Sequence, residues 1–233
     1  MTTTDALTHF LEGQFQAWNR QDVEPMHAAK GPVIAITRAP GCGGERIAQT
    51  LARELGLALY DGVLVEEIAR DANVSEQVIA TLDERIRSEL DAWLDGLGGD
   101  PDYSSNQYMK CLRSILFAIA AHGNAVIVGR GANFLLPAGK KTIGLYLFAP
   151  LESRVTNVMQ ERRLSADGAR KLIARIECER RQWVKDMCFA DVDDLLHYHL
   201  AINTALVSSE NIVQIVKDIV RTGQVREPLP NAP

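Results

Sequence analysis

Glycines and arginines crowd one short stretch, residues 38–46, which reads RAPGCGGER. The stretch follows the apolar run Val33–Ile36 and precedes apolar residues at helical spacing. A glycine turn between a buried strand and a helix lets backbone N–H groups face an anion at the positive end of the helix. Three glycines within four residues favour such an anion site over a tight turn without a ligand. The candidates for binding the phosphates of a cofactor are Arg38, Gly41, Cys42, Gly43, Gly44, Glu45 and Arg46.

This stretch departs from the standard phosphate-binding loop, the P-loop, at its most reactive positions. The pattern G-x-x-x-x-G-K-[ST] uses its lysine on the terminal phosphates and its hydroxyl on magnesium. When Gly41-Cys42-Gly43 is aligned with the last glycines of the loop, Gly44 stands at the lysine position, Arg46 at the hydroxyl position and Arg38 at that of the first glycine. No Ser or Thr follows. The backbone cradle is therefore kept, and the lysine and the hydroxyl are lost.

A second region, residues 151–185, is marked by its charge. It carries nine basic and five acidic side chains, a balance of +4 within a chain of net charge −5. Phosphoryl transfer needs cationic groups around the moving charge, and arginines supply them with paired N–H donors. A solvated helical face with i,i+4 pairs, such as Glu177 with Arg181, is the alternative and accounts for part of these charges.

The elements that must position these residues alternate between strands and helices. Apolar runs predict strands at 33–36, 57–60, 125–128, 142–148 and 201–204. Helical periodicity predicts helices from about 44 to 55, from an N-cap at Ser75 to Leu94, and over 106–121, 151–163, 166–185 and 208–223. Helices between apolar strands indicate an α/β protein, a three-layer α/β/α sandwich with a mostly parallel sheet.

Composition excludes several classes of protein. A length of 233 residues suits one domain with or without an appended element, and 24% charged residues argue against a disordered or fibrous chain. The acidic balance and 6% aromatic residues argue against a nucleic-acid partner. No run approaches about 18 apolar residues, so we expect no membrane partner.

Cysteine usage and the N-terminal residues indicate a reducing cytoplasm. The start has no basic region followed by an apolar run, as a signal peptide would. The four cysteines, at 42, 111, 178 and 188, have neither paired nor zinc-type spacing. His197 and His199 follow three aspartates, and we interpret this cluster as a polar turn, so no metal ligand is assigned.

Four segments together resemble the cytidylate kinase-like family. The first is ITRAPGCGGERIAQTLARELGLALYD, close to that family's ISREYGSGGREIAKKLAEELG…YD, and the others read VIVGRGAN, FAPLESR and INT. Their order and spacing fit from about residue 33 to 222. The resemblance implies a P-loop nucleoside monophosphate kinase fold that moves the γ-phosphoryl group of ATP to CMP or dCMP, with Mg²⁺.

The same resemblance implies roles for particular residues. Arg130 would hold the phosphate of the acceptor nucleotide, with Asp61 and Arg180 also binding substrate. The catalytic candidates are Arg46, Arg175 and Arg181.

The resemblance also suggests a division of the chain. Residues 1–30 would form an N-terminal helical extension, whose Phe10, Phe15 and Trp18 would pack on the body or on a second subunit of a homodimer. The kinase-like domain would span 31–223, with an acceptor-binding segment at 61–110 and a helical lid at 151–185. Residues 224–233 would form a disordered tail.

Departures from the family text keep three functions open. Glu45 and Arg46 stand in the reverse order of the family's R-E pair, and Asn133 replaces a frequent Asp. The chain could be a working kinase in which Arg46 or Arg38 replaces the lysine, because arginine also neutralises phosphate charge. It could be a nucleotide-binding sensor or partner module that has lost catalysis, or a kinase for another small phosphate acceptor.

Overall fold

The computed structural model describes residues 13–14, 18, 31–96, 107–136 and 142–223. The chain divides into two compact units. One, here called the helical unit, comprises residues 1–31 and 61–124. The other, here called the sheet unit, comprises residues 32–60 and 125–233. The predicted extension, apart from Gly13, Gln14 and Trp18, and the predicted tail lie outside the described residues.

A five-stranded sheet forms the centre of the sheet unit, with the strand order β2-β3-β1-β4-β5. Strand β1 pairs in parallel with β3 and β4, and β4 pairs in parallel with β5. The strands are β1 (Val33–Arg38), β2 (Ala58–Asp61), β3 (Ala125–Val128), β4 (Thr142–Phe148) and β5 (Leu200–Asn203). The predicted parallel sheet is confirmed, with β2 and β5 displaced by one residue from the expected ranges.

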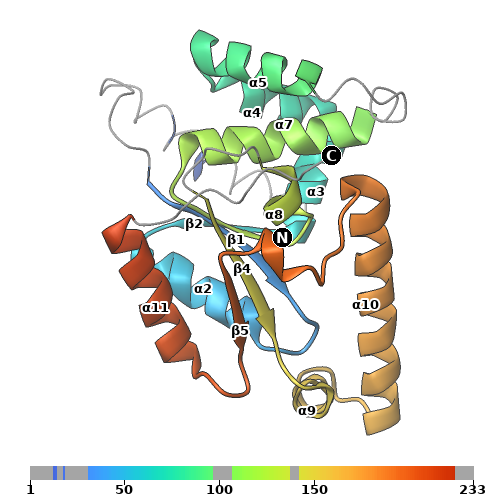
Figure 1. The fold of residues 1–233 in the computed structure, drawn as a ribbon. Coiled ribbons are helices and arrows are strands. Elements are labelled where there is room, and N and C mark those ends of the chain that lie inside the picture. The colour runs from blue at the N-terminus through green and yellow to red at the C-terminus, as the bar shows by residue number, and fades with distance from the viewer. Residues whose placement is uncertain (1–12, 15–17, 19–30, 97–106, 137–141, 224–233) are drawn as a thin grey trace. The chain divides into compact units, whose positions relative to one another are not determined.

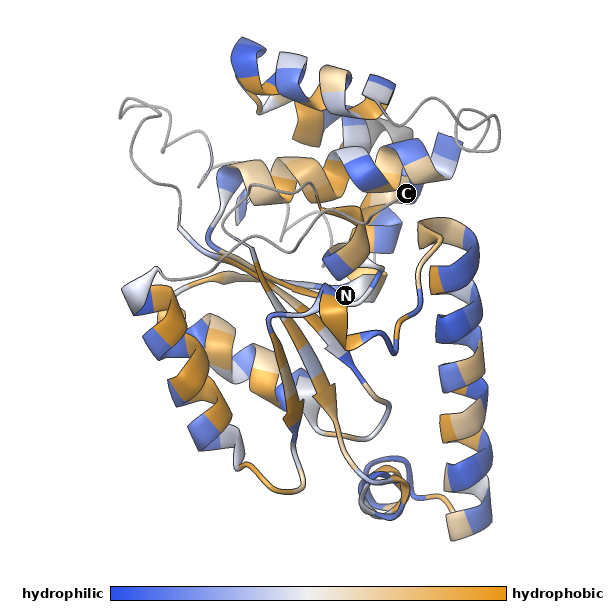
Figure 2. Ribbon diagram, viewed as in Figure 1, coloured by the Kyte–Doolittle hydropathy of each residue, from blue (hydrophilic) through white to orange (hydrophobic). Residues whose placement is uncertain are grey.

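Helices cover both faces of this sheet. Helices α2 (Gly44–Leu55) and α11 (Ser209–Thr222) lie on one face, and α8 (Ala132–Leu135) and α10 (Ala166–Cys188) lie on the other (Figure 1). Alternate strand residues such as Ile34, Ile36 and Leu145 are fully buried in the core shared with α2 and α11. In Figure 2 the apolar side of α11 is turned toward the strands. The predicted three-layer α/β/α arrangement is confirmed.

The strand order places the connections that follow β1, β3 and β4 at one edge of the sheet. Parallel strands end on the same side, and ligands of such sheets bind at that side. The connections are residues 39–43 after β1, residues 129–131 after β3, and Ala149-Pro150 before α9 (Leu151–Arg162). A short helix, η1 (Leu195–His197), precedes β5. The glycine turn and Arg130 therefore belong to one edge.

The helical unit consists of α3 (Gly62–Arg70), α4 (Ala72–Ala80), α5 (Glu84–Gly96) and α7 (Gln107–His122). The single helix predicted from Ser75 to Leu94 is wrong. The chain breaks it at residues 81–83, where Asp83 accepts a hydrogen bond from the Ile86 N–H and begins α5. Ser75 lies inside α4, buried, and its Oγ donates to the carbonyl of Ile68. Apolar periodicity continues across the break, so it could not reveal it.

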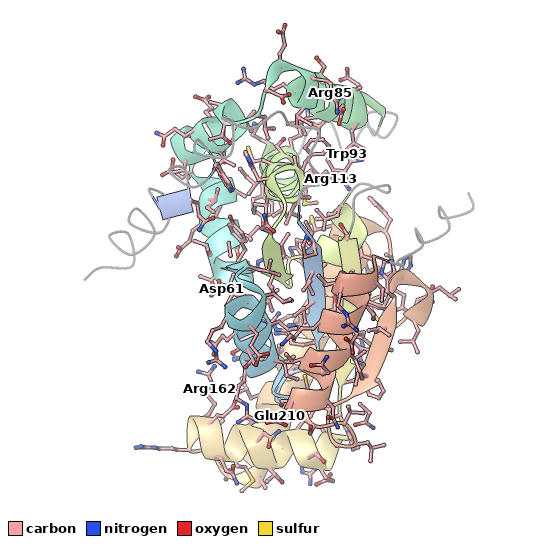
Figure 3. All side chains as sticks on the ribbon, turned by 90° about the vertical axis from the view of Figure 1, so that its left-hand side faces the viewer. Asp61, Arg85, Trp93, Arg113, Arg162 and Glu210 are labelled. Carbon is pink, nitrogen blue, oxygen red and sulfur yellow. The ribbon has the colours of Figure 1, made fainter. Side chains whose placement is uncertain are left out.

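Aromatic contacts join the elements of the helical unit. The Trp18 ring stacks on His122 with centroids 4.2 Å apart, so this aromatic of the predicted extension packs on the body of its own unit. Arg113 of α7 lies over Trp93 of α5, 5.9 Å from the ring centre (Figure 3).

Among the described helices, none is long and apolar enough to cross a membrane.

Candidate functional site

The glycine loop after β1 is anchored by its carbonyl groups. The carbonyls of residues 40, 41 and 42 accept hydrogen bonds from Arg154 Nη1 at 3.3 Å, Asn157 Nδ2 at 2.8 Å and Thr204 Oγ1 at 2.8 Å. In a trans peptide the N–H points away from the carbonyl that precedes it. The Cys42 N–H donates within the turn to the carbonyl of Ala39 at 3.2 Å. Pinning the carbonyls therefore turns the N–H groups of residues 41 and 43 away from these anchors.

The loop leads directly into the N-terminus of α2. Gly43 is the N-cap residue, with φ of 78°, and makes no side-chain capping bond. The first turn of a twelve-residue helix carries unpaired N–H groups and partial positive charge, which suit a phosphate. Gly41 has φ of +79°, and a Cβ there would lie 2.7 Å from the carbonyl oxygen of Arg154. Glycine is thus required at position 41 by both conformation and space.

Three arginines from three elements surround this loop. Arg180 of α10 donates through Nη1 to the carbonyl oxygen of Arg38 at 2.7 Å. The Nη1 of Arg38 would lie 2.7 Å from a Cβ at Gly129, the residue before Arg130. Arg38 Nη2 also lies 3.3 Å from Oε1 of Glu45. The structure therefore brings Arg38, which the sequence assigned to the cofactor phosphates, together with Arg130 and Arg180, which it assigned to the substrate.

The positive charges of these arginines repel one another, and the pKa values show it. Burial, and then the charge of Arg38, lowers the pKa of Arg180 to about 10. The pKa of Arg130 is lowered by the same two causes. The Nε of Arg38 is buried and makes no hydrogen bond among the described residues. Like charges gathered beside the exposed Arg38–Glu45 pair form a site that an entering anion would stabilise.

Arg130 is held in an unusual backbone conformation. Its φ is 48°, and the glycines on either side also have positive φ, 84° at Gly129 and 66° at Gly131. A non-glycine residue there costs about 1–2 kcal/mol, and such strain gathers at functional sites. A Cβ at Gly131 would lie 2.9 Å from both Trp183 and Cys188 of α10, so this turn also packs tightly.

Arg46 lies apart from this cluster. It is exposed on α2. The pKa of Glu210, the first-turn acid of α11 labelled in Figure 3, is lowered by its own backbone N–H, then by Ser208, and least by the charge of Arg46. Counting along the loop from Arg38 also places Glu45, not Arg46, at the hydroxyl position.

The other predicted catalytic arginines, Arg175 and Arg181, are paired with acids. Arg175 is exposed and lies 3.8 Å from Glu179. Arg181 donates through Nε to Asp193 at 2.7 Å. At 100° per residue, positions 175 and 180 point in different directions from the helix axis, and Arg180 is the one whose side chain reaches the loop.

Most basic side chains of residues 151–185 lie on a solvated helical face, the alternative to a phosphate-binding role, and several of them form ion pairs. Arg170 pairs with Glu152, and Lys171 pairs with Asp167. The expected i,i+4 pair of Glu177 with Arg181 is replaced, because Glu177 accepts from Arg154 at 2.8 Å instead. Arg154 is buried and bonds to the loop, so this pair ties α10 to the loop anchor.

Two more predicted residues have clear structural partners. Asp61 is the N-cap of α3, and its Oδ1 accepts from the N–H groups of Val63 and Leu64. Cys42 is buried, its pKa is raised by burial, and its Sγ donates to the carbonyl of Leu147 at 3.4 Å. Its thiol therefore holds the loop against β4.

Sequence reasoning assigned no role to the loop anchors Arg154, Asn157 and Thr204. Arg154 and Thr204 stand inside the segments FAPLESR and INT, which carried the family resemblance. That resemblance was the available signal for them. No rule of spacing pairs Thr204 with a carbonyl 162 residues earlier.

The residues present fit phosphate groups better than a directly held metal ion. Guanidinium groups and helix N–H groups suit phosphate oxygens, whereas Mg²⁺ prefers oxygen ligands. The acid beside the loop, Glu45, is paired with Arg38. In the part of the chain that the structure describes, no group of three or more His, Cys, Asp or Glu could hold a metal. We therefore assign Mg²⁺ no protein ligand and derive no step through it.

Known proteins resemble this chain over most of its length. It is 26% identical to a protein named cytidylate kinase from Pyrococcus horikoshii, over 79% of this chain and 86% of the relative. It is also 26% identical to a cytidylate kinase of Methanocaldococcus jannaschii, over 81% of this chain and 97% of the relative.

A solved structure shares the fold. An uncharacterized protein from Eubacterium ventriosum superposes with a TM-score of 0.57 at 17% identity, over 82% of this chain and 98% of that one. The sequence pattern of the cytidylate kinase-like family matches residues 33–206, which include the glycine loop, Arg130 and Arg180. Because that match covers most of the chain, the protein belongs to the cytidylate kinase-like family.

Proposed function

We propose that the protein transfers the γ-phosphoryl group of ATP to CMP, dCMP or a similar small phosphate acceptor. The observation that carries this proposal is the convergence of Arg38, Arg130 and Arg180 on a glycine loop whose carbonyls are pinned outward. Family membership supports the reaction class. The relatives' name supports the acceptor.

Each part of the edge has a role in this proposal. The loop and first-turn N–H groups of α2 bind the donor phosphates, and Arg130 binds the phosphate of the acceptor. An acceptor phosphate oxygen attacks the γ-phosphorus, the bond to the β–γ bridging oxygen breaks, and ADP leaves. Arg180 stabilises the negative charge on the moving group, because its Nη1 donates to the backbone carbonyl of Arg38 and its guanidinium lies close enough to Arg38 and Arg130 for their charges to lower its pKa.

A nucleotide-binding protein without catalysis is the second candidate. It is favoured by Gly44 at the lysine position, and by the ion pairs that hold Arg175 and Arg181 on acidic side chains. An anionic Glu45 beside the loop also lowers affinity for a triphosphate unless its carboxylate turns away.

One assay separates the two functions. Purified protein is incubated with ATP, Mg²⁺ and a panel of nucleoside monophosphates, and ADP formation is measured. We expect turnover with CMP or dCMP. Binding of ATP or CMP by calorimetry, without turnover for any acceptor, would establish the second candidate instead.

The role of Arg130 is tested with a matched variant. Arg130→Ala should weaken CMP binding about 10–100-fold and ATP binding much less, because it removes a charged hydrogen-bond donor from the acceptor phosphate. Arg163→Ala is the control, since Arg163 is also an arginine with positive φ, at 53°, but lies exposed at the end of α9. Equal losses for the two nucleotides in Arg130→Ala would contradict the assignment.

A further inference from the structure

The side chain of Arg38 occupies the space that a side chain at position 44 would need. A Cβ on Gly44 would lie 2.8 Å from the Cβ and 3.1 Å from the Cγ of Arg38. Distances under 3.0 Å are not tolerated without movement. A lysine at position 44 and an arginine at position 38 therefore exclude each other in this backbone.

The two departures from the P-loop pattern are therefore coupled: a glycine and a basic residue have exchanged places between positions 38 and 44. The pattern has glycine where this chain has Arg38, and lysine where it has Gly44. The closest contact is between the two Cβ positions, so only glycine at one position leaves room for a side chain at the other. The positive charge that the pattern places at its second-last residue is moved here to the end of β1.

We infer that Arg38 binds the donor phosphates in place of the P-loop lysine, and that Glu45 is the counter-ion which the phosphate displaces. This inference rests on the proposed function only in that the loop binds phosphate. A guanidinium differs from an ammonium because its planar fork binds two oxygens at once. Arg38 is therefore suited to bridging neighbouring phosphates.

The surroundings of Arg38 favour exchange of Glu45 for a phosphate. The side chain of Arg38 is 16% exposed and that of Glu45 is 74% exposed, so solvent weakens their pair. Arg130 and Arg180 add like charge beside Arg38, and the Nε of Arg38 is buried without a hydrogen bond among the described residues. An anion with several oxygens satisfies these donors better than one exposed carboxylate.

Calorimetry with inorganic tripolyphosphate at constant ionic strength tests the inference without needing turnover. Arg38→Gln should weaken tripolyphosphate binding at least about tenfold, because a charged hydrogen-bond donor is lost. Arg38→Lys should lose less, since the charge remains. Glu45→Gln should tighten binding roughly two- to fivefold, because the competing carboxylate is gone. Arg53→Gln and Glu161→Gln, exposed residues elsewhere on α2 and α9, are the charge-matched controls.

The exchange itself is tested by moving the charge back. Arg38→Gly should weaken tripolyphosphate binding, and the double variant Arg38→Gly with Gly44→Lys should recover most of the loss. Gly44→Lys alone should destabilise the fold, because the new side chain meets Arg38. Circular dichroism and denaturant unfolding confirm that each variant used for binding is folded.

Binding and turnover separate failure of this inference from failure of the proposed function. Tripolyphosphate affinity in Arg38→Gln within twofold of the wild-type value, or no recovery in the double variant, would overturn the inference. A loss in Arg46→Gln as large as that in Arg38→Gln would overturn it as well. If the variants change tripolyphosphate affinity as expected but no nucleotide is turned over, the inference about Arg38 holds and the proposed kinase activity is refuted.

Discussion

Two glycine turns leave neighbouring strands at the same edge of the sheet, and they are built differently. Residues 39–43 follow β1 and lead into α2, a helix of twelve residues. Residues 129–131 follow β3 and lead into α8, a helix of four residues. The first turn has its carbonyls held by three side chains, whereas the second carries an arginine at positive φ between two glycines.

The difference follows from the helices behind the turns. A twelve-residue helix supplies unpaired N–H groups and a dipole, so the first turn can bind an anion with its backbone. A four-residue helix supplies little of either, so an anion at the second turn must be bound by a side chain. Arg130 supplies the side chain in the second turn, and its positive φ strains the backbone there. In the proposed function, this edge of the sheet would thus offer two kinds of phosphate ligand.

Helix α10 is common to both turns. Arg180 bonds to the backbone at the start of the first turn, and Trp183 and Cys188 pack against Gly131 of the second. Positions 180 and 183 lie on one side of a helix. Movement of α10 would therefore change both turns together.

The largest effect is expected from substituting Gly41 in the first turn. Gly41→Ala should lower the free energy of unfolding by about 2–4 kcal/mol, because the methyl group meets a backbone carbonyl and φ is positive. Gly43→Ala is the matched control: φ is +78° and a Cβ meets nothing within 4 Å, so we expect a loss of about 1 kcal/mol. Denaturant unfolding measures both, and equal losses would show that the anchored carbonyls do not confine the turn.

A smaller effect is expected from the strain in the second turn. Arg130→Gly should be more stable than Arg130→Ala by about 1 kcal/mol, because glycine adopts φ of 48° without steric cost. Both variants lack the guanidinium, so both should lose CMP affinity alike. Unfolding and CMP titrations provide the two measurements. A more stable alanine variant would mean that this turn relaxes and that the contrast with the first turn is overstated.

The smallest effect is expected where α10 is tied to the sheet. Tyr146 donates to Asp193 at 3.0 Å, and Arg181 holds the other oxygen of the same carboxylate. Tyr146→Phe should cost about 1 kcal/mol of unfolding free energy at pH 8. ATP and CMP affinities should fall by the same small factor, because α10 touches both turns. A loss confined to one nucleotide would contradict this.

The pH dependence of the same pair gives an independent measurement. Burial, and then Asp193, raises the pKa of Tyr146 to about 12, whereas an unfolded tyrosine ionises near pH 10. The unfolded chain therefore releases this proton first as pH rises. The stabilisation is complete below pH 10 and is lost as pH rises toward 12. The difference in unfolding free energy between wild type and Tyr146→Phe should therefore be smaller at pH 11 than at pH 9.

Local pattern was enough for the strands and the longer helices of the sheet unit, but it did not reveal the short helices α8 and η1. The apolar runs at 33–36, 125–128 and 142–148 became strands because residues buried on both faces of a parallel sheet need no polar alternation. The cap at Ser208, where the last predicted helix begins, was equally readable, since its side chain bonds within the next turn. The break at 81–83 was not readable, because the apolar period continues through it.

The sequence by itself determined the strands, the glycine turn after the first of them and the absence of a lysine from that turn, because each depends on residues adjacent in the chain. Only the tertiary structure decided which arginines meet. Arg38, Gly129 and Arg180 converge through strand order and helix rotation, which no spacing rule encodes. Charge on a helix face can pair with a neighbour or reach a loop, and only packing distinguishes Arg181 on Asp193 from Arg180 on the loop.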